Sequence, residues 1–223
     1  MKQHVDPDDG FNFPAKAAAL KVVWTEMLGR SNDDQFARRG EYAIPGYVLC
    51  LPWSRRPREQ QEVEIIHRLG VPYSRIVGVD NERAKLAVTS RKFPGIVTQG
   101  MTGDVVDAVR LFPYKFCAMN LDLCGRYMSA AQIVKDILAL DKLTKRAYIA
   151  VTIFNGRERA DEWDAISNSD MGQMGLLTGR DRKRIEQVKG GNEVEVCRTG
   201  TYTTPTFRKM TYVIFAITQG DEK

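Results

Sequence analysis

The 223-residue chain has few of the residues that most often hold metals. It contains two histidines and four cysteines, and no two cysteines form a Cys-x-x-Cys pair. A structural zinc site needs four such ligands at close spacing, so none is predicted. Cys50, Cys117 and Cys197 stand in apolar runs, where a free thiol behaves as a small buried hydrophobe. We therefore do not expect disulfides.

Long apolar stretches are also missing. No run approaches the ~20 apolar residues that a membrane span needs. The first ten residues are too polar and acidic for a signal peptide. We therefore expect a cytoplasmic protein that does not contact a membrane. Because no Gly-x-Gly-x-x-Gly is present, the sequence predicts no nicotinamide or flavin dinucleotide site.

The composition is that of a folded domain with a moderate positive charge. Hydrophobic residues make up 43% of the chain and charged residues 27%, which is enough apolar material for a full core. The net charge is +5. A basic surface suits a polyanionic partner such as nucleic acid. A charge this small also serves simple solubility, so the partner stays open at this level.

Most of the chain alternates between apolar strands and amphipathic helices. Strands are predicted at residues 47–52, 75–80, 95–98, 115–123 and 146–154, with helices at 57–69, 82–93, 103–112 and 129–140, the last one N-capped by Ser129. Such alternation predicts a parallel sheet with helices on both faces. A helix at 180–189 and an antiparallel hairpin of strands at 193–202 and 210–218 complete the prediction.

The predicted fold class is thus α/β and Rossmann-like, with a mostly parallel, seven-stranded sheet. Residues 1–45 form an N-terminal arm and a helix at 14–28, which ends at Gly29. Residues 46–223 form the α/β domain.

An acidic residue, Asp80, stands at the end of the second predicted strand. A carboxylate at this point of a βαβ unit commonly holds a ribose through its hydroxyls, which suggests a nucleoside ligand. The same side chain could instead cap the helix that follows. Both roles are compatible with each other.

Two polar residues, Asn120 and Asp122, interrupt the apolar fourth strand near its carboxyl end. Ligands of open α/β sheets bind at that edge, which makes the pair the best catalytic candidates. A buried hydrogen-bond network that holds the turn at Gly125 is the other interpretation. Cys124 could be a nucleophile with a lowered pKa, but no flanking Pro-Cys motif supports this, and a structural thiol is the favoured interpretation.

The strand and helix order resembles the class I S-adenosylmethionine-dependent methyltransferases over about residues 45–219. Two runs resemble divergent members carried by phages and plasmids, namely Leu51-Pro52-Trp53 after the first strand and Asn120-Leu121-Asp122-Leu123-Cys124-Gly125 after the fourth. The resemblance implies that S-adenosylmethionine is the cofactor and that a methyl group is transferred to nucleic acid or a related anionic substrate.

The resemblance also implies roles for single residues. Leu51, Pro52 and Trp53 would lie against the methionine part of the cofactor, and Glu62 would approach the same region. The ribose would bind Asp80, and Asn81 would pack beside the adenine. By the same resemblance, Asp104 would accept a hydrogen bond from the adenine amino group, and Asn120 and Asp122 would stand next to the transferred methyl group. For Asp104, a charge that matches the dipole of the next helix is an equally good interpretation.

The chain departs from the family at the loop after the first strand. The family has a Gly-x-Gly turn there, whereas this chain has Pro52-Trp53-Ser54-Arg55-Arg56-Pro57. A catalytically inactive methyltransferase-like module that binds nucleic acid or protein is therefore the alternative hypothesis. A fold alone cannot decide between the two.

Six arginines follow strands one, four and five of the predicted sheet. All would stand at the same carboxyl edge, where guanidinium groups suit a nucleic-acid backbone. Taken singly, each could be a solvated loop charge. The predicted nucleic-acid-binding residues are Arg55, Arg56, Arg58, Arg126, Arg157 and Arg159.

Overall fold

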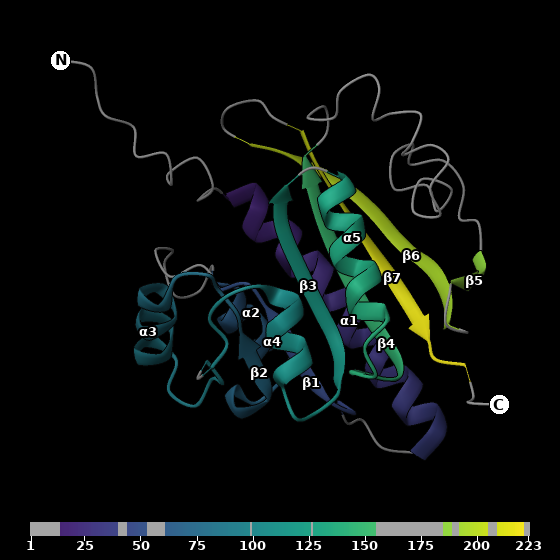
Figure 1. The fold of residues 1–223 in the computed structure, drawn as a ribbon, viewed down its shortest axis with the longest axis horizontal. Coiled ribbons are helices and arrows are strands. Elements are labelled where there is room, and N and C mark those ends of the chain that lie inside the picture. The colour runs from purple at the N-terminus through teal and green to yellow at the C-terminus, as the bar shows by residue number, and fades with distance from the viewer. Residues whose placement is uncertain are drawn as a thin grey trace.

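The computed structural model describes residues 14–39, 44–52, 61–98, 100–125, 127–154, 185–188, 192–204 and 209–220. They build a seven-stranded sheet in the order β2-β1-β3-β4-β7-β6-β5 (Figure 1). The strands are β1 Tyr47–Cys50, β2 Ile76–Gly78, β3 Phe116–Gly125, β4 Leu143–Phe154, β5 Ile185–Val188, β6 Asn192–Thr203 and β7 Lys209–Thr218.

Four strands form a parallel half of the sheet, in which β1 pairs with β2 and β3, and β3 pairs with β4. The strand β7 then lies between β4 and β6 and is antiparallel to both, and β5 is antiparallel to β6. Parallel strands that are buried on both faces need apolar side chains throughout, and β1 and β2 consist of such residues.

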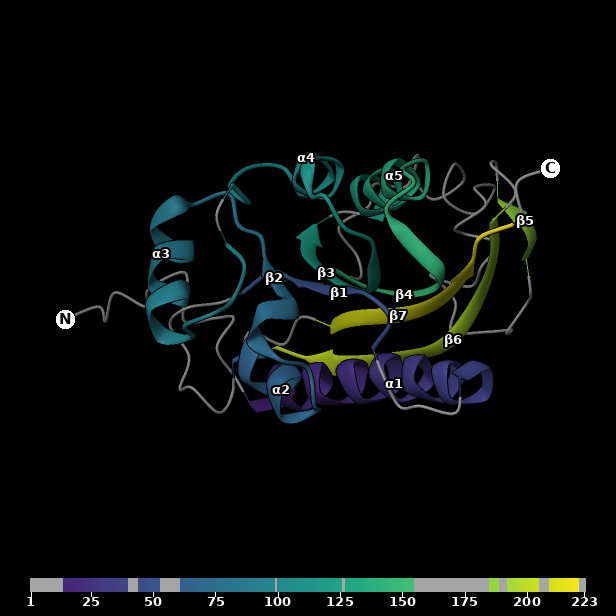
Figure 2. The ribbon, with the colours of Figure 1, turned by 90° about the horizontal axis from the view of Figure 1, so that it is seen from below.

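Helices cover both faces of the sheet (Figure 2). The helices are α1 Pro14–Arg39, α2 Glu62–Arg68, α3 Arg83–Lys92, α4 Val105–Leu111 and α5 Tyr127–Leu138. Figure 2 shows α4 and α5 on one face, α1 and α2 on the other, and α3 beyond the β2 edge. Each face has its own buried apolar cluster, one with side chains of α4 and α5 and one with side chains of α1 and α2. None of the helices in the described segments is long and apolar enough to cross a bilayer.

The α/β, Rossmann-like fold is confirmed, and six of the seven predicted strands are present. The strand predicted at residues 95–98 is wrong in extent, because only Val97 pairs with β2, as an isolated bridge to Val77. Gly95 and Gly100, both with positive φ, turn the backbone on either side of it. The seventh strand is instead β5, at residues where a helix was predicted. Its backbone pairing with β6 overrides the weak helical preference of a short segment.

Two helix ends also differ from the prediction. The helix α1 continues through Gly29 to Arg39. Gly29 itself is exposed, but Leu28 before it and Ser31 two residues later are buried. The contacts of these buried residues offset the ~1 kcal/mol that glycine costs in a helix. The helix α5 begins at Tyr127, so Ser129 lies inside the helix and is not its N-cap.

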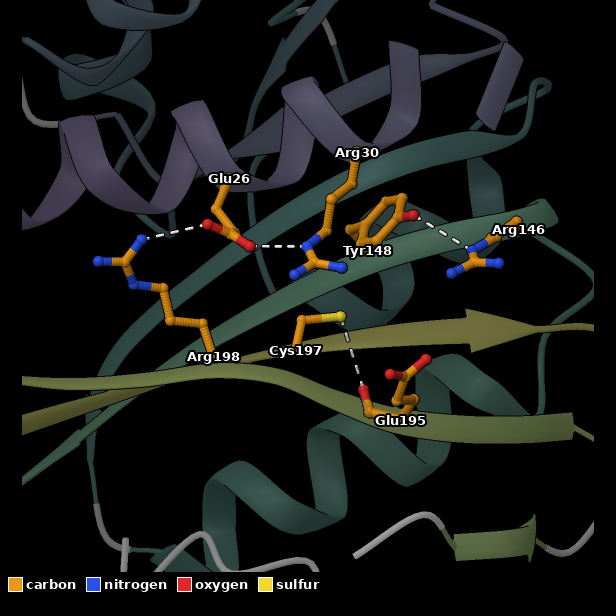
Figure 3. A network of polar contacts seen from close by, with 7 residues as sticks. All are labelled: Glu26, Arg30, Arg146, Tyr148, Glu195, Cys197 and Arg198. Atoms are coloured by element: carbon orange, nitrogen blue, oxygen red, sulfur yellow. Dashed lines mark hydrogen bonds and ion pairs between the residues drawn. The ribbon is translucent and has the colours of Figure 1, made fainter. Parts of the chain in front are cut away.

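Polar contacts attach the middle of α1 to the sheet (Figure 3). The Glu26 carboxylate accepts from Arg30 at 2.6 Å and from Arg198 of β6 at 3.1 Å. Beside them, Arg146 donates to the Tyr148 hydroxyl at 3.2 Å. The helix thus crosses from β3 and β4 to β6, and its buried side chains belong to the same core as these strands.

Candidate functional site

A cleft of about 620 Å³ opens at the carboxyl ends of β1, β2 and β3. Residues that follow β1 and β2, residues of β3, and residues of α1, α2, α4 and α5 line it. This is the edge at which open α/β sheets bind ligands, because the strands there end in loops whose side chains converge. The cleft has the size of typical small-molecule sites.

The wall after β2 carries Asp80, which is half-buried. Its Oδ1 accepts the Glu82 backbone N–H at 2.8 Å. Asp80 is not the N-cap of α3, because that position is Glu82, and the hydrogen bond instead holds the turn just before the helix. Burial raises the pKa of Asp80 above its usual value, although the hydrogen bond from Glu82 and the Lys85 charge oppose this. Asp80 also lines the cleft together with Asn81. Its hydrogen bond to Glu82 therefore leaves Asp80 at the cleft wall.

The segment before α4 joins the same wall. The Asp80 carbonyl accepts the Gly103 N–H at 3.1 Å, and an isolated bridge links Asp80 to Thr102. Gly103 has a φ of 125°, which only glycine adopts without strain. The next residue, Asp104, lines the cleft and N-caps α4 by accepting the Val106 N–H at 2.7 Å. Its predicted role at the helix start is therefore confirmed.

The wall after β1 consists of Leu51 and Pro52. Pro52 packs against Gly78 of β2, and a Cβ added at Gly78 would lie 3.0 Å from Pro52 Cγ. Because Gly78 has no side chain, the ring of Pro52 can pack directly against the backbone of β2. The apolar lining continues with Val79, Val105 and Leu123.

Side chains of β3 alternate between the two faces of the sheet. Met119 and Leu121 belong to the core under α4 and α5, so Asn120 and Asp122 point toward α1 and α2. Asn120 is fully buried and donates from Nδ2 to Glu62 Oε1 at 2.6 Å. Asp122 lines the cleft and forms an ion pair with Lys16 of α1. The two polar residues of β3 are thus bonded to two different helices.

The first residue of α2, Glu62, lies between these elements. Its Oε1 also accepts from Trp24 Nε1 at 2.8 Å, and the side chain is almost fully buried at the cleft wall. Burial raises the pKa of Glu62 to about 7, and the nearby Asp122 charge adds to this. The hydrogen bonds from Asn120 and Trp24 and the charge of Lys16 lower it only in part. Glu62 therefore changes its protonation near neutral pH.

The structure brings together six of the eight residues predicted for catalysis and cofactor binding. Leu51, Pro52, Asp80, Asn81 and Asp104 all line the cleft, and Asp122 does so from β3. Asn120 does not line it and reaches it only through Glu62. The remaining residues lie outside the described part of the chain, namely Trp53, Arg55, Arg56, Arg58, Arg126, Arg157, Arg159 and the side chain of Cys124.

Sequence reasoning missed the contribution of α1. Lys16 and Leu20 line the cleft, and Trp24 bonds to Glu62. One signal was present, because Lys16 is a single charged residue within an alanine-rich run and is buried in the structure. A lysine at a buried helix position needs a partner, but its identity depends on tertiary packing.

No protein-family model matches the chain, and no curated protein is similar to it in sequence. Among solved structures, a candidate methylase from Haemophilus influenzae superposes with a TM-score of 0.51 and 7% identity, over 93% of this chain and 92% of its own. A candidate RNA methyltransferase from Pyrococcus horikoshii gives a TM-score of 0.46 and 12% identity, over 92% of this chain and 84% of its own. The Haemophilus likeness shows that the two chains share a fold, and this is an α/β fold of the kind predicted from the sequence.

Proposed function

We propose that this protein is an S-adenosylmethionine-dependent methyltransferase that acts on nucleic acid or a related anionic substrate. The observation that carries the proposal is the cleft at the carboxyl edge of the sheet, with Asp80 on its wall at the end of β2. A carboxylate at this position suits a ribose. The methyltransferase-like fold is consistent with this ligand.

The residues of the cleft fit the cofactor as two halves. Asp80, Asn81 and Asp104 offer acceptors and a flat polar wall for the adenosine half. Leu51, Pro52 and Leu123 offer apolar surface, and Glu62 and Asp122 offer negative charge, for the sulfonium half. The cofactor supplies the methyl group on a positively charged sulfur.

Residues of β3 would act on the group that accepts the methyl group. Asp122 lines the cleft, so its carboxylate can orient the acceptor group and accept its proton. Asn120 is a positioning residue, because it is fully buried and acts through Glu62. The rate then depends chiefly on the alignment of acceptor and methyl group.

A nucleic-acid substrate is supported by charge. The net charge is +5, and α3, which follows Asn81, carries Arg83, Lys85, Arg91 and Lys92 and no acidic residue. The predicted arginines at the cleft edge are part of the same proposal, as is a kinship with phage- or plasmid-borne methyltransferases. The double variant Arg55→Glu/Arg56→Glu should weaken oligonucleotide binding and reduce its salt dependence. Unchanged affinity and salt slope would contradict this substrate class.

An inactive binding module is the second candidate, and one observation favours it. The Asp122 carboxylate, which the reaction would need, is paired with Lys16, and Pro52 stands where the family has a glycine turn. Such a module would bind nucleic acid or protein without methyl transfer.

Calorimetric titration with S-adenosylmethionine decides between the two candidates. We expect binding, and Asp80→Ala should weaken it by about 10- to 100-fold, the value of a hydrogen bond to a charged group. Asp107→Asn is the matched control, because Asp107 is exposed on α4 and bonds to Arg110. No binding at millimolar ligand would exclude the enzyme. Binding that Asp80→Ala leaves unchanged would mean that the ribose lies elsewhere.

A further inference from the structure

Three ionisable side chains meet where α1, α2 and β3 meet the cleft. Lys16, Glu62 and Asp122 all line it, and Lys16 pairs with Asp122. These three residues comprise two carboxylic acids and one lysine, so Lys16 can balance the charge of Asp122 but not that of an ionised Glu62 as well. The other described groups that face Glu62 are neutral, because Trp24 and Asn120 carry no charge and burial raises the pKa of the Cys50 thiol well above its usual value.

The same cluster has too few hydrogen-bond donors. The hydrogen bonds from Trp24 and Asn120 both end on Glu62 Oε1, so the carboxylate's second oxygen remains for the cleft that Glu62 lines. Asn120 Oδ1 is buried and accepts no hydrogen bond from any residue that the structure describes. The described donors thus serve one of the two Glu62 oxygens, and the arrangement favours a ligand that brings N–H donors and positive charge to the other oxygen at the cleft.

We propose that Glu62 is the anionic receptor for the ammonium and the neighbouring sulfonium of the methyl donor, and that it releases its proton to solvent when these groups bind. This inference rests on the proposed function. The donor carries an ammonium, a sulfonium and a carboxylate. The ammonium supplies N–H donors, and the single net positive charge of the donor balances the ionised Glu62. Proton release keeps the charge of the buried cluster balanced in both states.

The product of methyl transfer differs from the donor at this point. It is a thioether, so the sulfonium charge is lost while the ammonium remains. Glu62 then regains its proton more readily, and the product is held less firmly than the donor. The same carboxyl group thus distinguishes the charged donor from its neutral-sulfur product.

The first experiment uses the unmodified chain. Calorimetric titrations with S-adenosylmethionine, S-adenosylhomocysteine and adenosine are run at pH 5.5 and pH 7.5, each in two buffers of different ionisation enthalpy. With a free pKa of about 7, we expect S-adenosylmethionine to bind about 20-fold more tightly at pH 7.5, with release of nearly one proton at pH 5.5. The thioether should show a smaller change.

Adenosine controls for the other carboxylate of the cleft whose pKa is raised. It lacks the amino-acid end and tests the wall at Asp80 alone. We expect nearly the same adenosine affinity at the two pH values. An adenosine affinity that changes as much as that of S-adenosylmethionine would assign the proton to Asp80 and overturn the role of Glu62.

The second experiment replaces the charge and keeps the shape. Glu62→Gln retains an acceptor oxygen for Trp24 and Asn120, and should bind S-adenosylmethionine at least tenfold more weakly at pH 7.5, with no proton release. Glu64→Gln is the matched control, because Glu64 is buried on the same helix and bonds to Arg68 and Tyr73, away from the cleft. It should leave affinity and proton release unchanged.

The outcomes separate the inference from the proposed function. If S-adenosylmethionine does not bind at either pH, the proposed function fails. If it binds with the same affinity at both pH values, and Glu62→Gln binds it like the unmodified chain, the cofactor assignment stands and the role of Glu62 is overturned.

Discussion

Glu62 and Glu26 are both held by hydrogen bonds that involve α1, and the pKa values of their carboxyl groups shift in opposite directions. Glu62 is buried, bonds to the neutral donors Trp24 and Asn120, and has its pKa raised to about 7. Glu26 is more exposed, and burial alone would raise its pKa, but the hydrogen bonds from Arg30 and Arg198 outweigh this and lower it (Figure 3). The type of partner, rather than the residue, sets the direction.

This difference separates a structural contact from a candidate binding group. The Glu26 cluster has its countercharges in place and attaches α1 to β6. Among the described residues, the Glu62 cluster holds two carboxylates and one lysine at a cleft wall. Strongly shifted pKa values in a cleft are typical of functional sites. A carboxylate whose charge is already balanced by protein groups gains less from binding a cationic ligand.

The largest expected effect is on the pH dependence of folding in Glu62→Gln. A carboxyl whose pKa is about 7 when folded and 4.5 when unfolded stabilises the fold fully below pH 4.5 and loses this contribution as pH rises through 7. The difference of 2.5 pH units amounts to about 3 kcal/mol. Between pH 4.5 and pH 8, the free energy of unfolding of Glu62→Gln should therefore rise by up to this amount relative to that of the unmodified chain.

Urea denaturation at the two pH values measures this gain. Glu26→Gln, which removes the oppositely shifted carboxyl, is the comparison. A difference between Glu62→Gln and the unmodified chain that stays constant with pH would show that Glu62 is ionised at neutral pH and would remove the contrast.

A smaller effect is expected for Trp24→Phe. The ring Nε1–H donates to Glu62, and Trp24 is fully buried. Losing the donor and part of the ring should cost about 2 kcal/mol. The loss should be greater at pH 8 than at pH 6, because the hydrogen bond to the ionised carboxylate is the stronger one.

Denaturation at both pH values tests this, with Met27→Leu as the volume-conserving control in the same core. Met27 is fully buried, so the control should cost under about 1.5 kcal/mol at either pH. An equal loss for Trp24→Phe at pH 6 and pH 8 would contradict a charge on Glu62 at the higher pH.

The smallest effect is expected for Glu26→Gln. Its ion pairs are partly exposed, so the loss at pH 7 should be less than about 1 kcal/mol. Because the pKa of Glu26 is lowered on folding, its contribution is present above the unfolded pKa and is lost as pH falls through the folded one. A double-mutant cycle with Arg198→Gln measures it. A coupling that grows on acidification would contradict the assignment.

The α/β order of the fold was predictable because its signals are local. The apolar runs of β1 and β3 and the glycine-marked turns can be recognised within a few residues. The prediction was wrong at residues 95–98 and 185–188, where four-residue segments take their state from neighbours. It was also wrong at Gly29, where the packing of α1 overrides a helix-ending residue.

The candidate site divides in the same way. Asp80 and Asp104 were predictable, because each stands just ahead of a predicted helix, and each accepts a backbone N–H two residues ahead. The pairing of Lys16 with Asp122 was not, since residues so distant in sequence meet only when α1 packs on β3.

The order of strands and helices, and the acidic residues between them, could be read from the amino-acid sequence, because turn chemistry and apolar periodicity act over a few residues. Folding was needed to bring α1 to the cleft and to surround Glu62 with neutral donors. Burial and countercharge are properties of the packed chain, and these two quantities set the charge of a carboxyl group.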